Sequence, residues 1–517
     1  MSLHTLIFFS FLCAGVYYLT PGRFKWMILL LVSYFYYAWC GVGALPFMLL
    51  TTLSTWAGAL VIGHIGEKSK AELKARKAEL DAAGKKALKA QAKSRQRIVF
   101  WAVLLLNFGV LALVKYTSPV LEMLGRQPLD LLLPLGISFY TFQSMGYLLD
   151  VSNGKYAPER NPAKFALFVS FFPQLIQGPI ARHDQLAHQL TEPRRFEFDS
   201  ITRGALLILW GFFKKKVIAD RALPLVSAVF DGHEPYGGAV IVIAVLFYSL
   251  QQYCDFSGGI DLVTGIAELF GIRLAPNFRQ PYFSISLGDF WRRWHISLGA
   301  WMRDYVFYPF ALTRPVSRLS KAAKARFGAD FGRALPAALG NILVFLLVGI
   351  WHGLSANYVL WGLYNGLILA ISALLEPLYK RTNERLGRRI VDSRAFYVFR
   401  ILRTFVIVNI GWYFDRALRG MDAFAMLGKT LFAPMTVQLT DGTLLALGLT
   451  AFDFTILAWA TLLLMIVSVL KERGMHVRER VLQLPVVPRV ILLYAFMYFT
   501  LAHYAGAGTS GFMYAIF

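Results

Sequence analysis

One histidine lies at the end of an apolar run. His352 follows Ile342–Trp351 and precedes Gly353. Ionisable residues inside membrane segments are rare and usually face an interior cavity, and a neutral imidazole is a suitable general base near neutral pH. The alternative is a histidine that joins two helices through one hydrogen bond. His352 is therefore the first candidate for acid–base chemistry.

Polar side chains continue beyond this histidine at helical spacing. Asn357, Trp361 and Asn365 are four residues apart, so a helix would place them on one face. They could line a cavity, or the two amides could join neighbouring helices by hydrogen bonds.

The segment 289–297 is a second candidate, because it combines charged residues, tryptophans and a histidine. We expect Arg292 and His295 to share a helical face and Asp289 to pair with Arg293. Arginine and tryptophan together are typical of a membrane interface. The functional alternative is a polar opening that receives an anionic or phosphate-bearing donor.

A carboxylate and a hydroxyl stand near the end of an earlier apolar run. Asp255 and Ser257 belong to the segment 252–261. We expect Asp255 to be a structural partner of a nearby arginine rather than a catalytic acid. The candidate substrate-binding residues are Arg292, Trp294, Trp351, Asn357, Asp255 and Ser257.

The composition indicates a polytopic, all-α membrane protein. Hydrophobic residues make up 57% of the 517 residues and charged residues 16%, against about 25% charged in soluble domains. This excludes ordinary soluble, fibrous, disordered and nucleic-acid-binding classes. The net charge of +23 fits lysine and arginine retained in cytoplasmic loops. The three cysteines, at 13, 40 and 254, lie in apolar stretches and form neither a disulfide framework nor a metal motif.

Apolar stretches predict about 11–14 membrane segments, since a spanning helix needs about 20 apolar residues. The first stretch reads as a retained helix rather than a cleaved signal peptide. The strong candidates are 3–19, 24–40, 44–65, 98–116, 129–151, 237–253, 334–352, 356–376, 396–414, 454–470 and 490–504. Less regular candidates are 163–180, 201–218 and 257–272.

Basic loops orient these segments. The stretch 67–97 holds eleven basic and four acidic residues and is interrupted at Gly84, which predicts a cytoplasmic helical hairpin. Placing the basic loops inside puts both the N-terminus and the tail 505–517 outside. The other loops expected inside are 313–333, 380–394 and 471–489, and the loop expected outside is 415–453.

Two stretches contain residues that break helices. Pro134 stands within one apolar run, and the run 172–179 holds two prolines and two glutamines. Broken backbone at membrane depth occurs only where protein or a water-filled cavity satisfies it. We therefore expect a re-entrant or half-membrane element around 172–179.

An ordered set of motifs resembles the membrane-bound O-acyltransferase (MBOAT) family, in particular its bacterial branch of alginate O-acetyltransferases and teichoic-acid D-alanylation proteins. The resemblance covers roughly residues 130–370. It rests on the motifs that begin at Leu135 (LGISFYTFQ), Phe172 (FPQLIQGP), Tyr253 (YCDFSG), Asn277 (NFRQPY), Asp289 (DFWRRWHISLGAWMRDY) and Trp351 (WHG).

The resemblance implies one membrane domain over 1–517, with helices around a central tunnel. It implies that His352 is the active-site histidine and His295 the second histidine of the family. The last six residues, FMYAIF, resemble a C-terminal tyrosine motif of related machinery, so Tyr514 is a candidate acyl acceptor. An aromatic anchor at the membrane interface is the alternative for this tyrosine.

These features predict an acyltransferase in a bacterial cytoplasmic membrane. We expect it to move a small acyl group, foremost acetyl, from acetyl-CoA or an acyl-carrier thioester to a polysaccharide. The expected partners are an extracytoplasmic SGNH-type acyltransferase and membrane lipid, with no nucleic acid, no metal and no tightly bound cofactor. The alternatives are D-alanyl transfer to teichoic acid, acylation of a lipid or protein, and a flippase for lipid-linked saccharides.

Overall fold

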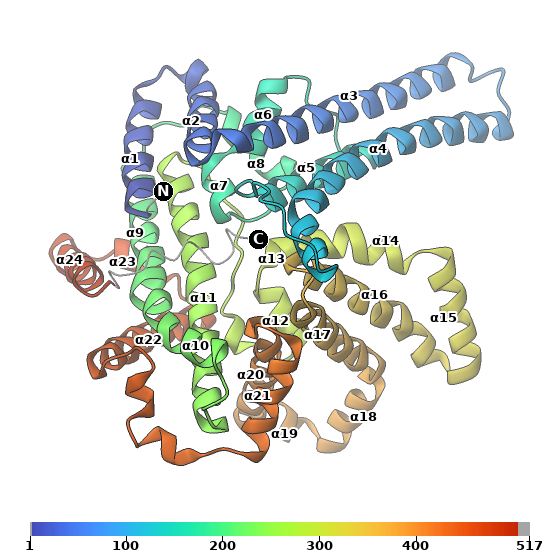
Figure 1. Cartoon of the computed structure of the whole chain (residues 1–517). Helices are drawn as coiled ribbons and strands as arrows, with labels where there is room; N and C mark the ends of the chain where they lie inside the picture. The colour runs from blue at the N-terminus through green and yellow to red at the C-terminus, as the bar shows by residue number, and fades with distance from the viewer. Residues whose placement is uncertain (1–2, 505–517) are drawn as a thin grey trace. The chain divides into compact units, whose positions relative to one another are not determined.

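The structure is a computed structural model that describes residues 3–504 (Figure 1). Helices and connecting turns form all of this range, without a strand, so the all-α prediction is confirmed. The chain divides into two compact units, which are described separately. Unit 1 comprises Met1–Gly204 and Ile266–Ala275, and unit 2 comprises Ala205–Gly265 and Pro276–Phe517.

Two long helices of unit 1 form an antiparallel hairpin. Helices α3 (Leu45–Ala75) and α4 (Ala82–Met123) lie side by side (Figure 1). Asp81 caps α4 by accepting a hydrogen bond from the Gly84 backbone N–H at 2.7 Å. The sequence analysis placed the interruption of the hairpin at Gly84. The chain instead reverses just before that residue, because α4 already begins at Ala82.

Helix α5 of unit 1 packs on both helices of this hairpin, and α6 packs on α3. The predicted segment 129–151 is wrong over 129–136, because α5 begins only at Ile137. Gly136 precedes it with φ +67°, and a Cβ there would lie 2.5 Å from the Leu175 carbonyl oxygen. Only glycine tolerates both constraints. The other helices are α1 (Leu3–Leu19), α2 (Lys25–Cys40), α5 (Ile137–Ser152), α6 (Pro162–Ser170), α7 (Phe172–Gln177) and α8 (His183–Thr191).

The backbone breaks between α6 and α7, as the prolines predict, and side chains satisfy the break. The Phe172 N–H donates to Ser33 Oγ at 3.1 Å. Gln174 donates to Gln143 Oε1 at 2.6 Å and to the Pro179 carbonyl at 2.8 Å. These bonds replace part of the helical hydrogen bonding that a break in apolar surroundings loses.

Helix α11 (Gly238–Leu269) is continuous. The separate segment predicted at 257–272 is therefore wrong, because it is the second half of this helix. Helix α9 (Phe198–Phe212) passes into a π-helical stretch, Phe213–Ala219, that leads into α10 (Asp220–Asp231).

Unit 2 contains most of the later helices. Its short 3-10 turns lie at Pro281–Phe283, Thr436–Leu439 and Thr443–Ala446, and a π-helical stretch lies at Arg303–Phe307. Unit 1 has 3-10 turns at Gly22–Phe24 and Val42–Ala44. The helices are α12 (Leu287–Arg293), α13 (Ile296–Met302), α14 (Tyr308–Ala311), α15 (Arg314–Phe327), α16 (Ala329–His352), α17 (Ala356–Leu374), α18 (Glu376–Leu386), α19 (Arg388–Val391), α20 (Arg394–Arg416), α21 (Gly420–Phe432), α22 (Ala451–Glu472), α23 (Val477–Leu482) and α24 (Val486–Ala502).

Seven helices within residues 3–504 are long and apolar enough to cross a membrane, and α1 and α24 are shorter apolar helices. In α4 and α22 only 22% of the most apolar window is buried, as expected for helices that face lipid. The chain is thus an integral, multi-pass membrane protein. The other predicted segments are short or broken helices, and their depth in a bilayer stays a prediction.

Cysteine labelling can test the predicted sidedness. A single cysteine at the exposed position Ala87, in a variant without the three native cysteines, should react with a membrane-impermeant maleimide only after the inner face is opened. A single cysteine at Thr440, in the loop expected outside, should react in intact cells. The opposite labelling pattern would contradict the orientation.

Candidate active site

The candidate site is built on the α16–α17 helical pair of unit 2. The two helices approach closely at glycines: a Cβ on Gly349 would overlap the Tyr358 carbonyl oxygen, and one on Gly362 would overlap the Phe345 carbonyl oxygen. Small residues allow such backbone contact between membrane helices. This contact fixes the end of α16 against the first turns of α17.

His352 is the last residue of α16 and is buried among aromatic rings. Its ring stacks on Tyr358 with centroids 5.8 Å apart, and it meets Trp361 edge to face at 5.3 Å. Asn357, Trp361 and Asn365 are all buried on α17, so the predicted common face is confirmed. The sequence-predicted base and this face therefore lie together.

His295 occupies a sharp turn between α12 and α13. Its φ of +47° and ψ of 52° are left-handed, so Arg292 and His295 do not share a helical face as predicted. Asn277 holds the turn: its Oδ1 accepts hydrogen bonds from Ser297 N–H and Oγ, both at 2.9 Å, and lies 3.4 Å from His295 Nδ1. Burial lowers the pKa of His295 to about 3, which keeps this imidazole neutral.

One indole joins the two histidines. The Trp351 ring centroid lies 6.5 Å from that of His295 and 4.8 Å from that of His352. Trp294, beside His295, is buried against Phe278 at 5.1 Å. The structure thus brings four sequence-predicted residues of two separate motifs into one aromatic cluster of unit 2.

Asp255 and Ser257 are bound by lysines. Asp255 pairs with Lys215, and Ser257 Oγ accepts a hydrogen bond from Lys214 Nζ at 2.9 Å. Asp255 thus has a basic partner, as expected, and this partner is a lysine. Between the two residues stands Phe256, whose ring meets that of His295 edge to face at 4.8 Å. Asp255 and Ser257 therefore flank the residue whose ring contacts His295.

The lysines belong to a buried ionic cluster that the sequence analysis missed. Lys215 and Lys216 also pair with Asp220, at 3.0 and 2.6 Å, and Lys214 pairs with Asp261 at 2.6 Å. Three consecutive lysines inside the predicted apolar segment 201–218 were the available signal. Buried charges require such partners.

Arg292 differs from its neighbour in exposure. Its side chain is 72% exposed and lies 3.6 Å from Asp289, whereas Arg293 is 15% exposed and lies 3.1 Å from Asp289. The predicted Asp289–Arg293 pair is confirmed. Tyr514 lies outside the described residues. Within residues 3–504, no group of three or more His, Cys, Asp or Glu side chains could hold a metal ion.

Comparison with known proteins identifies the family. A family model described as MBOAT, membrane-bound O-acyltransferase family, matches residues 157–411. A probable alginate O-acetylase AlgI from Azotobacter vinelandii is 32% identical over 80% of this chain and 74% of the relative. The chain belongs to the membrane-bound O-acyltransferase family.

Two further relatives of this MBOAT protein carry related names. A probable alginate O-acetylase AlgI from Pseudomonas syringae pv. tomato is 33% identical over 78% of this chain and 69% of the relative. A peptidoglycan O-acetyltransferase from Helicobacter pylori is 28% identical over 80% of this chain and 76% of the relative. The protein is therefore a membrane-embedded acyltransferase.

Adding a methyl group at the α16–α17 contact should destabilise the helix pair that carries the candidate site. Gly362→Ala forces the helices apart, so we expect its free energy of unfolding to fall by about 1–3 kcal/mol, measured by thermal unfolding in detergent. Gly428→Ala is the control, because nothing lies within 4 Å of the added Cβ on α21. Equal stability of the two variants would contradict the packing argument.

Proposed function

We propose that this MBOAT protein transfers a small acyl group, foremost acetyl, from a cytoplasmic thioester to a hydroxyl outside, for O-acylation of an exopolysaccharide or cell-wall glycan. The observation that carries the proposal is the burial of His352 at the end of an apolar helix, joined to His295 through Trp351. Relatives named alginate O-acetylase and peptidoglycan O-acetyltransferase support the choice of acetyl and of a glycan.

In the proposed step, His352 accepts the proton of the attacking hydroxyl as the new C–O bond forms at the thioester carbonyl. The C–S bond then breaks, and the thiolate takes up the proton from the imidazolium. His352 thus acts first as a general base and then as a general acid, and its imidazole is neutral again at the end of each turnover. The products are an oxygen ester and a free thiol.

The donor in this proposal is acetyl-CoA or an acyl-carrier thioester. Both carry phosphate, which suits the exposed guanidinium of Arg292. Asn357 is buried and precedes Tyr358, whose ring stacks on His352, so it is the candidate amide for orienting the reacting groups. Trp351 supplies the apolar wall between the two histidines, and Trp294 packs on Phe278 next to His295.

The proposed acceptor is Tyr514 or a serine of a partner protein. An extracytoplasmic SGNH-type acyltransferase then passes the acyl group to the glycan, with the MBOAT protein resident in a bacterial cytoplasmic membrane. The first transfer converts a thioester into an oxygen ester, and each later transfer exchanges one oxygen ester for another, so none of them needs a further energy source.

Replacing the proposed base should abolish transfer without unfolding the protein. We expect His352→Ala and His352→Gln to lower glycan O-acetylation by about 10²–10⁴-fold, measured as ester-linked acetate on polysaccharide from expressing cells. His188→Ala, at an exposed histidine of α8, is the control and should retain activity. Normal acetylation by a folded His352→Gln protein would remove His352 from the chemistry.

Trapped turnover should place an acyl group on Tyr514. Mass spectrometry of the C-terminal peptide is expected to show an acetyl adduct in the wild type, increased when the extracytoplasmic partner is deleted, and none in Tyr514→Phe. Tyr498→Phe, at an exposed tyrosine of α24, is the control. Full activity of Tyr514→Phe would leave a partner's serine as the acceptor.

A further inference from the structure

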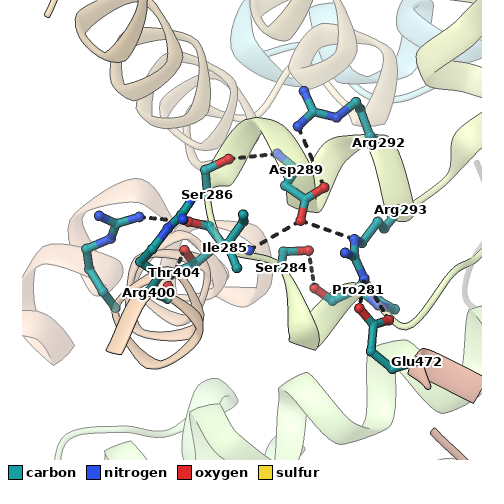
Figure 2. A network of polar contacts seen from close by, with 11 residues as sticks. Pro281, Ser284, Ile285, Ser286, Asp289, Arg292, Arg293, Arg400, Thr404 and Glu472 are labelled. Atoms are coloured by element: carbon teal, nitrogen blue, oxygen red, sulfur yellow. Dashed lines mark hydrogen bonds and ion pairs between the residues drawn. The ribbon is translucent and has the colours of Figure 1, made fainter. Parts of the chain in front are cut away.

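An ion-pair network ties α12 to the end of α22 in unit 2 (Figure 2). Arg293 Nη1 donates to both carboxylate oxygens of Glu472, at 2.9 and 2.8 Å. Its Nε lies 3.1 Å from Asp289 Oδ2, and the same oxygen accepts a hydrogen bond from the Ile285 N–H at 3.3 Å. One guanidinium thus joins two carboxylates that are 183 positions apart in the numbering.

The geometry of this network suits arginine. A planar guanidinium presents its N–H donors to two carboxylates in fixed directions, whereas an ammonium group, as in Lys215, pairs with carboxylates as a point charge. The Arg293 and Glu472 side chains are only 15% and 20% exposed, so water screens the pair weakly. Partial burial opposes the charge, but Glu472 and Asp289 raise the pKa of Arg293 above its usual value.

The main chain of Arg293 continues directly into the His295 turn. The Arg293 carbonyl accepts a hydrogen bond from the Arg279 N–H at 2.9 Å, and the Ile296 N–H donates to the Asn277 carbonyl at 3.0 Å. These two bonds fasten the turn to the extended segment 277–279. Because only Trp294 separates the end of α12 from His295, a shift of α12 is transmitted to this turn.

The opposite side of α12 reaches the surroundings of His352. Trp291 Nε1 donates to Asn365 Oδ1 at 3.1 Å, and the Trp291 ring meets that of Trp361 at 5.6 Å. Trp361 in turn contacts His352. Helix α12 is thus connected to both histidines.

We propose that Arg293 and Glu472 are positioning residues. Their ion pair holds α12 at the C-terminal end of α22 and thereby sets the placement of His295 relative to His352. This inference rests on the proposed function only for the expected change in kcat of acetyl transfer. The ion pair itself touches no reacting atom.

Conservative variants of both residues test the proposal. Glu472→Gln keeps the shape of the side chain but removes its charge. Arg293→Lys keeps the charge but loses the planar guanidinium that can contact two carboxylates in fixed directions. In full-length protein reconstituted in liposomes with radiolabelled acetyl-CoA, we expect both variants to lower kcat on the order of 10- to 100-fold with little change in the KM of the donor. In the double variant Arg293→Gln/Glu472→Gln, the loss should be smaller than the product of the losses in Arg293→Gln and Glu472→Gln.

A control variant shows whether the loss of any ion pair of unit 2 lowers kcat, or only the loss of the Arg293–Glu472 pair. Asp231→Asn removes the Arg416–Asp231 pair of unit 2, 2.9 Å long and with side chains 18% and 45% exposed, which is far in sequence from α12. It should leave kcat unchanged. Glu472 and Arg293 variants with lowered thermal stability but normal kcat at a temperature where they are folded would overturn the proposal.

Hydrogen exchange supplies a readout that needs no activity. In Glu472→Gln, mass spectrometry should show faster amide exchange over 294–297 than in the wild type and in Asp231→Asn. Faster exchange with a wild type that transfers no acetyl would support positioning and contradict the proposed function. Unchanged exchange and unchanged kcat in an active protein would overturn the positioning role alone.

Discussion

The direct backbone contact between α16 and α17 is the constraint on which the site depends. Gly349 and Gly362 leave no room for a Cβ between the helices, so the first turn of α17 covers the end of α16. His352 therefore meets Tyr358 and Trp361 at a fixed distance. In lipid, where burial of apolar surface gives little net drive between helices, such close packing is the main source of attraction.

Buried charge in unit 2 is arranged around the aromatic cluster rather than within it. Lys214 and Lys215 hold residues on either side of Phe256, whose ring contacts His295. A lysine left without its carboxylate would be strongly destabilising in such surroundings, so α11 and the π-helical stretch are fixed together. His295 then stands among neutral rings, and burial lowers its pKa and keeps its imidazole neutral.

Local patterns in the sequence predicted what depends on local chemistry. The apolar run before His352, the helical spacing of Asn357 and Asn365, and the break at 172–179 all describe single elements, and the structure confirms them. The helix start at Ile137 was missed because it depends on a contact between remote segments: Gly136 packs directly on the carbonyl of Leu175. Lys215 and Glu472 were missed as partners because ion pairs between remote segments leave no periodic signal.

The left-handed backbone of His295 shows how these contacts combine. Histidine tolerates this region better than most residues, but it still costs free energy. Asn277 compensates by accepting hydrogen bonds on the far side of the turn, and burial of Trp294 fixes the preceding residue. A helical continuation would instead carry the imidazole away from Phe256 and Trp351. The strained turn therefore places His295, just after the end of α12, near the Trp351 indole. The same indole contacts His352.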